Sequence, residues 1–294
     1  MKKLVLILLS LVMVFSLSAC GNKTEGTVVV GGKDFTEQDI LVQLVSELIE
    51  ANTDIKVVRK AYLGGSSIVA KSIETGDIDI YVEYTGTALM SVLNQEKMND
   101  ADAVYELVKK RYEEEKNIKW LEPLGFNNTF AITMKESRAN ELGIETLTDL
   151  GPKSKDFVFA STQEFLERPD GYDFFKQVYN VNFKEIKAMD AGLCYTAVKE
   201  DQADVNVSYA TDGRIPAFGL KVLEDDQSFF PPYYAAPLVR MDTLEKYPEL
   251  EEVLNSLAGK LTDEEMSNLN AKVDLEQRAS KAVAKEWLQE QGLI

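Results

Sequence analysis

The chain of 294 residues contains no histidine, and this absence removes whole classes of chemistry. Ser–His–Asp and Cys–His catalytic arrangements need an imidazole as the general base, and HExxH zinc sites need it as a ligand. The chain also has no Ser-x-x-Lys sequence, no GxxxxGK[ST] phosphate loop and no GxGxxG after a predicted strand. A carboxylate pair of glycosidase type is the remaining catalytic reading, but 49 acidic residues make such pairs unavoidable and uninformative. We therefore predict no enzyme, no cofactor and no metal site.

Cysteine is almost absent as well, with two in the whole chain. This number excludes a disulfide framework, and no CxxC pair is present. Cys194 lies in a stretch with an apolar pattern, so we expect a packed core thiol and not a nucleophile.

Positive charge is scarce, because 32 Lys and Arg oppose 49 Asp and Glu and leave a formal net charge of −17. A surface this acidic repels nucleic acid and anionic lipid headgroups and attracts cationic solutes. With 45% hydrophobic and 28% charged residues, the composition predicts a globular chain with one large or two medium domains.

The N-terminus has the pattern of a secretory signal. Two lysines precede an apolar stretch over 4–17, and Ser18, Ala19 and Cys20 follow it. We expect cleavage after a signal peptide at 1–19, lipid on Cys20 and a polar tether over 20–25, which anchors the protein on the outer face of the cell membrane. An uncleaved membrane anchor is the alternative, but the apolar stretch is shorter than the ~20 residues that a spanning helix needs.

The rest of the chain alternates between strand and helix patterns. Apolar runs predict strands at 28–30 and 55–59 and further strands up to 220–223, and an amphipathic pattern predicts a helix over 36–50. The segment 241–291 is predicted to be nearly all helix. This alternation indicates an α/β fold with largely parallel sheets.

Polar and aromatic side chains gather where the predicted strands end, at the edge where α/β sheets bind ligands. An aromatic residue or an arginine occurs in each such stretch, and the aromatic rings together suggest a cage. Because a quaternary ammonium cannot donate a hydrogen bond, proteins hold it between aromatic faces. Lys33 and Arg168 would then hold a carboxylate, and Arg168 could do so by two parallel hydrogen bonds. The stretches lie at 31–38, 81–87, 125–130, 164–171, 207–213 and 229–234.

Four of these motifs resemble one known family. GKDFTEQ at 32–38, YVEYTGT at 81–87, GFNNTF at 125–130 and YATDG at 209–213 follow a lipoprotein signal in this order. In this combination they resemble the substrate-binding proteins of osmoprotectant ABC transporters, which bind glycine betaine, carnitine or choline.

This resemblance implies a two-lobed clamp of the type II periplasmic-binding-protein fold, with each lobe a mixed sheet flanked by helices. Lobe 1 would comprise 26–124 and 220–294, and lobe 2 would comprise 125–219. The ligand would lie in the cleft, and the lobes would close over it by a hinge motion. The protein would be a monomer that delivers its ligand to the permease subunits.

The resemblance also implies roles for individual residues. Two positions of the implied site bear on the ligand. Phe130 stands where relatives often have tyrosine, and Thr87 has no charge, whereas a carboxylate there would suit choline. An uncharged Thr87 favours zwitterions such as glycine betaine, proline betaine or carnitine over choline. The implied cation cage comprises Tyr84, Phe130, Tyr209, Tyr233 or Tyr234, and the backbone carbonyl of Asn128, and the implied carboxylate site comprises Lys33, Thr87 and Arg168.

Three alternatives remain from the residues themselves. Arg168 could form a surface ion pair with Asp170 or Glu167 and have no ligand. The same clamp could bind another solute, such as a cationic amino acid or polyamine, which would require carboxylates for its N–H donors. A lipid-anchored hydrolase with two carboxylates is the third alternative.

Overall fold

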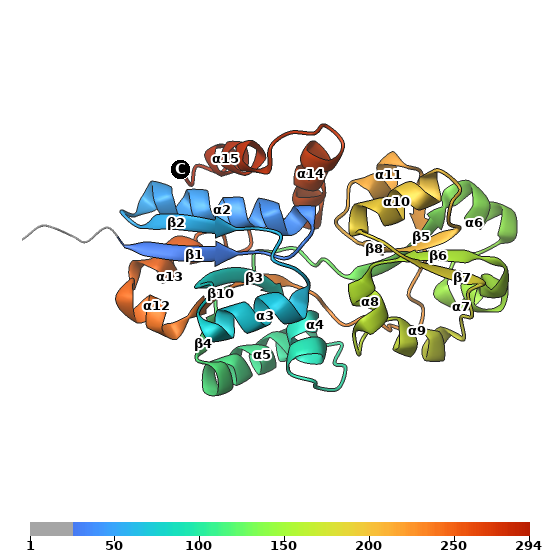
Figure 1. The fold of residues 1–294 in the computed structure, drawn as a ribbon, viewed down its shortest axis with the longest axis horizontal. Helices are drawn as coiled ribbons and strands as arrows, with labels where there is room; N and C mark the ends of the chain where they lie inside the picture. The colour runs from blue at the N-terminus through green and yellow to red at the C-terminus, as the bar shows by residue number, and fades with distance from the viewer. Residues whose placement is uncertain (1–25) are drawn as a thin grey trace, which may run out of the picture.

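Two five-stranded sheets, each with its own helices, form the protein in a computed structural model that describes residues 26–294 (Figure 1). The expected signal peptide, Cys20 and the tether lie outside the described residues. The first sheet has the order β2-β1-β3-β10-β4 and the second has the order β7-β6-β8-β5-β9. The strands are β1 (Thr27–Gly31), β2 (Lys56–Lys60), β3 (Ile80–Tyr84), β4 (Ile118–Trp120), β5 (Phe130–Lys135), β6 (Val158–Ser161), β7 (Glu185–Ala188), β8 (Val205–Tyr209), β9 (Leu220–Val222) and β10 (Ala235–Arg240).

Both sheets are mixed, as the family resemblance implied. β1 runs parallel to β2 and β3, and β6 runs parallel to β7 and β8. β10 is antiparallel to β3 and β4, and β5 is antiparallel to β8 and β9. The expectation of largely parallel sheets from the strand-helix alternation was therefore wrong for two strand pairs in each sheet.

The strand β10 was not predicted, because its sequence contains Pro237 and two alanines. Proline lacks a backbone N–H and is normally confined to sheet edges, yet β10 lies between β3 and β4. The backbone oxygen of Pro237 accepts a hydrogen bond from Leu121 N (2.9 Å), just beyond the end of β4. The backbone nitrogen of Pro237 lies on the same side, beyond the last residue of β4. Its lack of an N–H therefore removes no hydrogen bond of the β4–β10 ladder.

Helices cover both faces of the first sheet (Figure 1). The predicted amphipathic helix is α2 (Thr36–Asn52), which buries Ile40, Leu44 and Leu48 in the core. It packs beside the C-terminal helix α15 (Ser280–Glu290), so the two ends of the described chain share one lobe. The other helical segments of this lobe are α3 (Ser66–Thr75), α4 (Thr85–Thr87), η1 (Ala88–Val92), α5 (Ala101–Lys116), α12 (Met241–Lys246), α13 (Glu249–Asn255) and α14 (Asp263–Asp274).

The second sheet has a separate set of shorter helices. Cys194 lies on one of them and is fully buried, and burial raises the pKa of its thiol to about 12. The prediction of a packed core thiol is therefore confirmed. The helices are α6 (Glu136–Leu142), α7 (Leu147–Leu150), η2 (Gly151–Asp156), α8 (Gln163–Glu167), α9 (Tyr172–Tyr179), α10 (Ala191–Lys199) and α11 (Arg214–Ala217).

The chain passes between the two sheets twice, after β4 and after β9. The two crossings lie side by side, because Asn128 N donates to Tyr233 O (3.1 Å) and Asn127 bridges to Tyr234. The second crossing, expected at residue 220, comes later in the chain, because β9 pairs with β5 and keeps 220–222 in the second sheet. A strand pattern does not reveal which sheet an edge strand joins, and this explains the difference.

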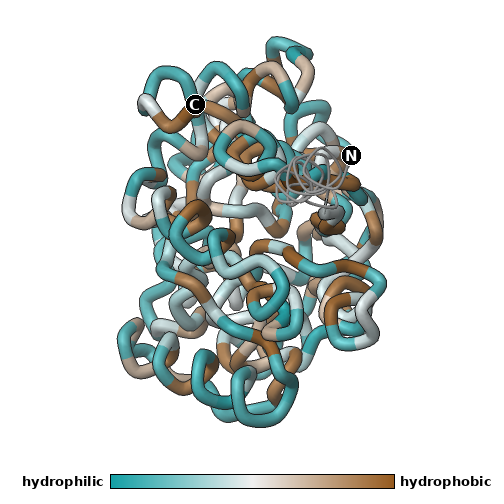
Figure 2. Tube along the Cα trace, turned by 90° about the vertical axis from the view of Figure 1, so that its left-hand side faces the viewer, coloured by the Kyte–Doolittle hydropathy of each residue, from teal (hydrophilic) through white to brown (hydrophobic). Residues whose placement is uncertain are grey.

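Hydrophilic residues lie mainly on the outside of the protein and hydrophobic residues mainly inside. The outer helical turns in Figure 2 are largely hydrophilic (teal), and hydrophobic stretches (brown) run through the interior. Within the described residues, no helix combines the length and the apolar character needed to cross a membrane.

Candidate functional site

A small cavity of about 20 Å³ lies between the two lobes, and residues of both lobes line it. Eight of the nine predicted ligand-binding residues meet there, and only Tyr234 does not. A larger cleft of about 570 Å³ adjoins the cavity and shares Phe35, Ser66, Glu164, Arg168 and Tyr209 with it. The complete lining of the cavity is Lys33, Phe35, Ser66, Tyr84, Thr87, Asn128, Phe130, Glu164, Arg168, Tyr209 and Tyr233.

The aromatic rings come from the ends of central strands. Tyr84 ends β3, Tyr209 ends β8 and Phe130 begins β5. The ring centroid of Phe130 lies 5.5 Å from that of Tyr209 and 5.7 Å from that of Tyr233, which it meets edge to face. Strand ends are held by the sheet, so the rings are presented on a rigid frame.

Phe35 is an aromatic residue of the site that was not predicted. It precedes α2 and stacks on Tyr209 with a centroid distance of 4.9 Å, and it lies 6.4 Å from Tyr84. Phe35 therefore joins the rings of the two lobes. Its position inside the 31–38 motif was the signal that could have identified it.

The adjacent residues Tyr233 and Tyr234 have different surroundings. Tyr233 is 2% exposed, lines the cavity and donates its hydroxyl to Asp170 Oδ2 (2.8 Å). Its ring passes so close to Gly86 that a Cβ atom there would lie 2.7 Å from it. Tyr234 is only partly buried and uses its backbone to bond Thr85. Of the two, Tyr233 faces the cavity.

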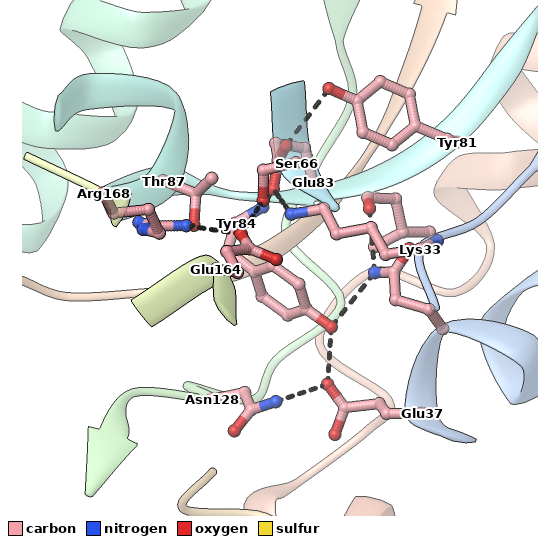
Figure 3. Close-up of polar contacts among 12 residues, drawn as sticks. Lys33, Glu37, Ser66, Tyr81, Glu83, Tyr84, Thr87, Asn128, Glu164 and Arg168 are labelled. Atoms are coloured by element: carbon pink, nitrogen blue, oxygen red, sulfur yellow. Dashed lines mark hydrogen bonds and ion pairs between the residues drawn. The ribbon is translucent and has the colours of Figure 1, made fainter. Parts of the chain in front are cut away.

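Lys33 is buried and ion-paired. Its Nζ donates to Glu83 Oε1 (2.5 Å) and lies 5.0 Å from the centre of the Tyr84 ring (Figure 3). Glu83 also accepts a hydrogen bond from Tyr84 N (2.7 Å). An ammonium group has three donors, so Lys33 retains donors beyond the one that pairs with Glu83.

Arg168 connects the second lobe to the first. Its Nε donates to Asp170 Oδ1 (2.8 Å), and its NH1 nitrogen donates to Thr87 Oγ1 (3.1 Å) and Glu164 Oε1 (3.1 Å). Its guanidinium carbon lies 5.2 Å from the centre of the Phe130 ring. The ion pair with Asp170 considered above exists, but it is buried in the site, and Glu164 takes the place expected for Glu167.

Glu164 is a carboxylate of the site that was not predicted. Its Oε1 accepts a hydrogen bond from Ser66 Oγ (2.6 Å) across the cleft. Burial raises the pKa of Glu164, but the charges of Arg168 and Lys33 outweigh burial and hold it below its ordinary value. Its position at the start of the 164–171 stretch was the signal that could have identified it.

Glu37 lies fully buried behind Tyr84 and accepts four hydrogen bonds. Its Oε1 accepts from Tyr84 Oη (2.7 Å) and Asn128 Nδ2 (2.8 Å), as Figure 3 shows. Its Oε2 accepts from Thr211 Oγ1 (2.5 Å) and Asn270 Nδ2 (3.1 Å). The pKa of Glu37 is raised above its ordinary value, because burial outweighs the four hydrogen bonds that act to lower it. The side chain of Asn128 thus serves Glu37, and the role of its backbone carbonyl toward a cation stays a prediction.

This architecture defines the class of the protein. Two mixed α/β sheets, joined by two adjacent crossings and enclosing a site between them, form a two-lobed binding protein of the type II periplasmic class. A solved structure described as a glycine betaine/carnitine/choline ABC transporter matches 90% of this chain and 99% of its own, with 32% identity and a TM-score of 0.75.

The sequence comparisons place the chain within one family. Residues 26–290 match the substrate-binding domain of ABC-type glycine betaine transport systems, and the chain belongs to this family. It is 37% identical over 276 residues to the carnitine transport binding protein OpuCC of Listeria monocytogenes, covering 93% of this chain and 90% of that protein. It is also 37% identical over 290 residues to a glycine-betaine-binding protein of Pseudomonas aeruginosa, covering 95% and 92%.

The family membership confirms the resemblance predicted from the four motifs. Members of this family are extracytoplasmic proteins that bind small ligands and deliver them to the permease of an ABC transporter, and they are not enzymes.

Proposed function

We propose that this protein captures zwitterionic quaternary ammonium solutes and delivers them to an ABC permease for osmoprotection, without catalysing a reaction. Its ligands would be glycine betaine, carnitine and proline betaine, with choline bound less well. One observation carries the proposal: aromatic rings from both lobes converge on one cavity that also has Arg168 and Thr87 in its wall. This arrangement suits a ligand with a methylated cation at one end and a carboxylate at the other.

The two ends of the ligand would meet different groups. The methylated ammonium would lie among Tyr84, Phe130, Tyr209 and Tyr233, and each aromatic face contributes about 0.5–2 kcal/mol. The carboxylate would accept hydrogen bonds from Arg168, Thr87 and the remaining donors of Lys33. Phe130 supplies a π face without a hydroxyl, so it contributes no hydrogen bond.

Ligand entry would require the lobes to separate. The cavity of about 20 Å³ has room for about one water molecule, whereas a betaine is several times larger. Contacts across the cleft, such as Ser66 with Glu164, hold the closed arrangement. We infer that the open clamp admits the ligand, the rings close on it, and the closed form docks onto the permease.

The remaining parts of the proposal concern attachment and assembly. The signal at 1–19 would be removed, Cys20 would carry lipid, and the tether 20–25 would hold a monomeric clamp at the outer face of the cell membrane. Lobe 1 would comprise 26–124 and the chain after 222, and lobe 2 would comprise the residues between.

Glu164 favours a second candidate ligand class. A carboxylate that faces the cavity can accept hydrogen bonds from the N–H groups of a cationic amino acid or polyamine. The clamp mechanism would be the same, and only the solute would differ.

Calorimetric titration of the chain from Lys23 to Ile294 with glycine betaine, carnitine, proline betaine and choline tests the proposal. We expect saturable binding of the zwitterions, weakened at least tenfold by Tyr209→Ala and by Arg168→Ala. Arg138→Ala, which removes an exposed arginine of α6, is the matched control and should leave the affinity unchanged. No binding of any of the four ligands would overturn the assignment, and binding of lysine or putrescine instead would establish the second candidate.

A further inference from the structure

Glu37 is a buried carboxylate without a basic partner. It is 3% exposed and forms no ion pair with any lysine or arginine among residues 26–294. The nearby cations have other partners, since Lys33 pairs with Glu83, and Arg214 pairs with Asp212 and Asp274. Burying an unpaired charge is unfavourable, so a neutral side chain would be the default choice at this position.

Backbone contacts fix the direction of the hydrogen bond between Tyr84 and Glu37. Lys33 N–H donates to Gln38 Oε1 (3.2 Å), which leaves Gln38 Nε2 to donate to Val82 O (3.0 Å) and to Tyr84 Oη (3.0 Å). Because Tyr84 Oη accepts from Gln38, its own proton points to Glu37 Oε1. Tyr84 therefore donates to Glu37, and its ring orientation depends on Glu37.

The two asparagines are oriented in the same way. Asn270 Nδ2 donates to Thr211 O (3.0 Å), so this nitrogen, and not the amide oxygen, faces Glu37. Asn128 Oδ1 accepts from Thr211 N (3.5 Å), so Asn128 Nδ2 faces Glu37. Three of the four groups around Glu37 are thus fixed as donors, and this set favours the ionised carboxylate against the opposing effect of burial.

We propose that Glu37 is the specificity-determining charge of the cage: an ionised carboxylate behind Tyr84 that makes the site prefer a cationic head over a neutral head of the same shape. This inference rests on the proposed function. Glu37 acts through Tyr84 and does not line the cavity, so it is a positioning residue. Its negative field favours a positive head from behind Tyr84, and its hydrogen bond with the hydroxyl raises the electron density of the Tyr84 ring.

The other carboxylates of the site are less suited to this role. Glu83 is neutralised by Lys33, and Asp170 is neutralised by Arg168. Glu164 shares its oxygen between Ser66 and Arg168. Glu37 is bonded only by neutral groups, so its field is not cancelled by an adjacent cation.

Two ligands of the same shape, one with a cationic head and one with a neutral head, distinguish the effect of charge from the effect of packing. Glycine betaine and 3,3-dimethylbutanoate both carry three methyl groups and a carboxylate, but only glycine betaine has a positive head. Both are titrated into the wild-type chain from Lys23 to Ile294 and into its Glu37→Gln and Glu37→Asp variants. We expect Glu37→Gln to weaken glycine betaine at least tenfold and 3,3-dimethylbutanoate less than threefold. Glu37→Asp should retain the wild-type ratio of the two affinities, because the charge remains.

Three results would overturn the inference. Glu37→Gln could reduce the affinity for both ligands equally, or leave the affinity for glycine betaine unchanged. It could also show the same ratio of the two affinities as Glu37→Asp. If 3,3-dimethylbutanoate binds too weakly to measure, equal loss of glycine betaine affinity in the Gln and Asp variants overturns it. Thermal unfolding checks the fold, and Glu37→Met replaces Glu37→Gln if the latter does not fold. Failure of the proposed function would appear separately, as absence of glycine betaine binding to the wild-type chain.

Discussion

At the scale of single residues, Tyr233 and Tyr234 form a natural pair for comparison. They are neighbours in the sequence and chemically identical, yet one ring lines the cavity and the other does not. The difference follows from strand geometry, because successive side chains of an extended segment point in opposite directions.

We predict that Tyr233→Ala weakens glycine betaine binding at least tenfold, since it removes a wall of the cage and leaves Asp170 without the tyrosine hydroxyl. Tyr234→Ala should change the affinity less than threefold. Calorimetry of both variants decides the matter, and a larger loss in Tyr234→Ala would contradict the placement of the two rings.

At the scale of elements, the two lobes approach each other closely between α14 and the loop that follows β8. Gly213 in this loop lies so near α14 that a Cβ atom would be 2.7 Å from Ala271 Cβ and 3.1 Å from Ser267 O. Its φ of −64° is accessible to any residue. Glycine is therefore needed here because a side chain would have no room, and not because of the backbone conformation.

We predict that Gly213→Ala impairs closure of the lobes and weakens ligand binding at least tenfold. The melting temperature without ligand should fall by no more than a few degrees, because each lobe keeps its own core. Gly143→Ala is the control, since a Cβ atom there would meet no atom of residues 26–294 within 4 Å; its φ of +60° costs stability but leaves the contact between the lobes unchanged. Unchanged affinity in Gly213→Ala would show that this contact does not limit closure.

At the scale of the whole molecule, polar contacts across the cleft hold the two lobes together. Ser66 bonds Glu164, and Thr87 bonds Arg168, so charged groups of the second lobe meet hydroxyl groups of the first. Of these four side chains, Glu164 is the one that titrates in the acidic range, and the hydrogen bond that it accepts from Ser66 is stronger when it is ionised.

This dependence predicts a response to pH. The pKa of Glu164 is lower in the folded protein than its unfolded value of about 4.3. The stability that Glu164 contributes is therefore complete above about pH 4.3 and lost as the pH falls through the lower folded pKa. We expect the melting temperature to fall less between pH 5 and pH 3 in Glu164→Gln than in the wild type. Glu167→Gln, an exposed carboxylate of the same helix, should behave as the wild type, and a parallel fall in all three proteins would contradict the role of Glu164.

Much of the site could be predicted because it follows from local patterns. Tyr84 and Tyr209 end apolar strands, and the strand ends of α/β sheets face ligands. An aromatic cage at these positions could therefore be predicted from the sequence. Glu164 lies in a predicted stretch but was not singled out among 49 acids, and Asn270 lies on a helix with a surface pattern, outside every predicted stretch. Their roles arise from partners more than 90 residues away in the chain, as in the bonds from Ser66 and to Glu37.

The amino-acid sequence by itself determined the α/β class, the acidic character, the exclusion of histidine chemistry and the motifs that mark the family. These properties are local or compositional, so they can be read without knowing which segments meet. Only the tertiary structure decided that β9 joins the second sheet, that Tyr233 and not Tyr234 faces the cavity, and that Glu37 lies buried without a cation. These facts depend on which distant segments pack together, and this depends on the burial and hydrogen bonding of the whole chain at once.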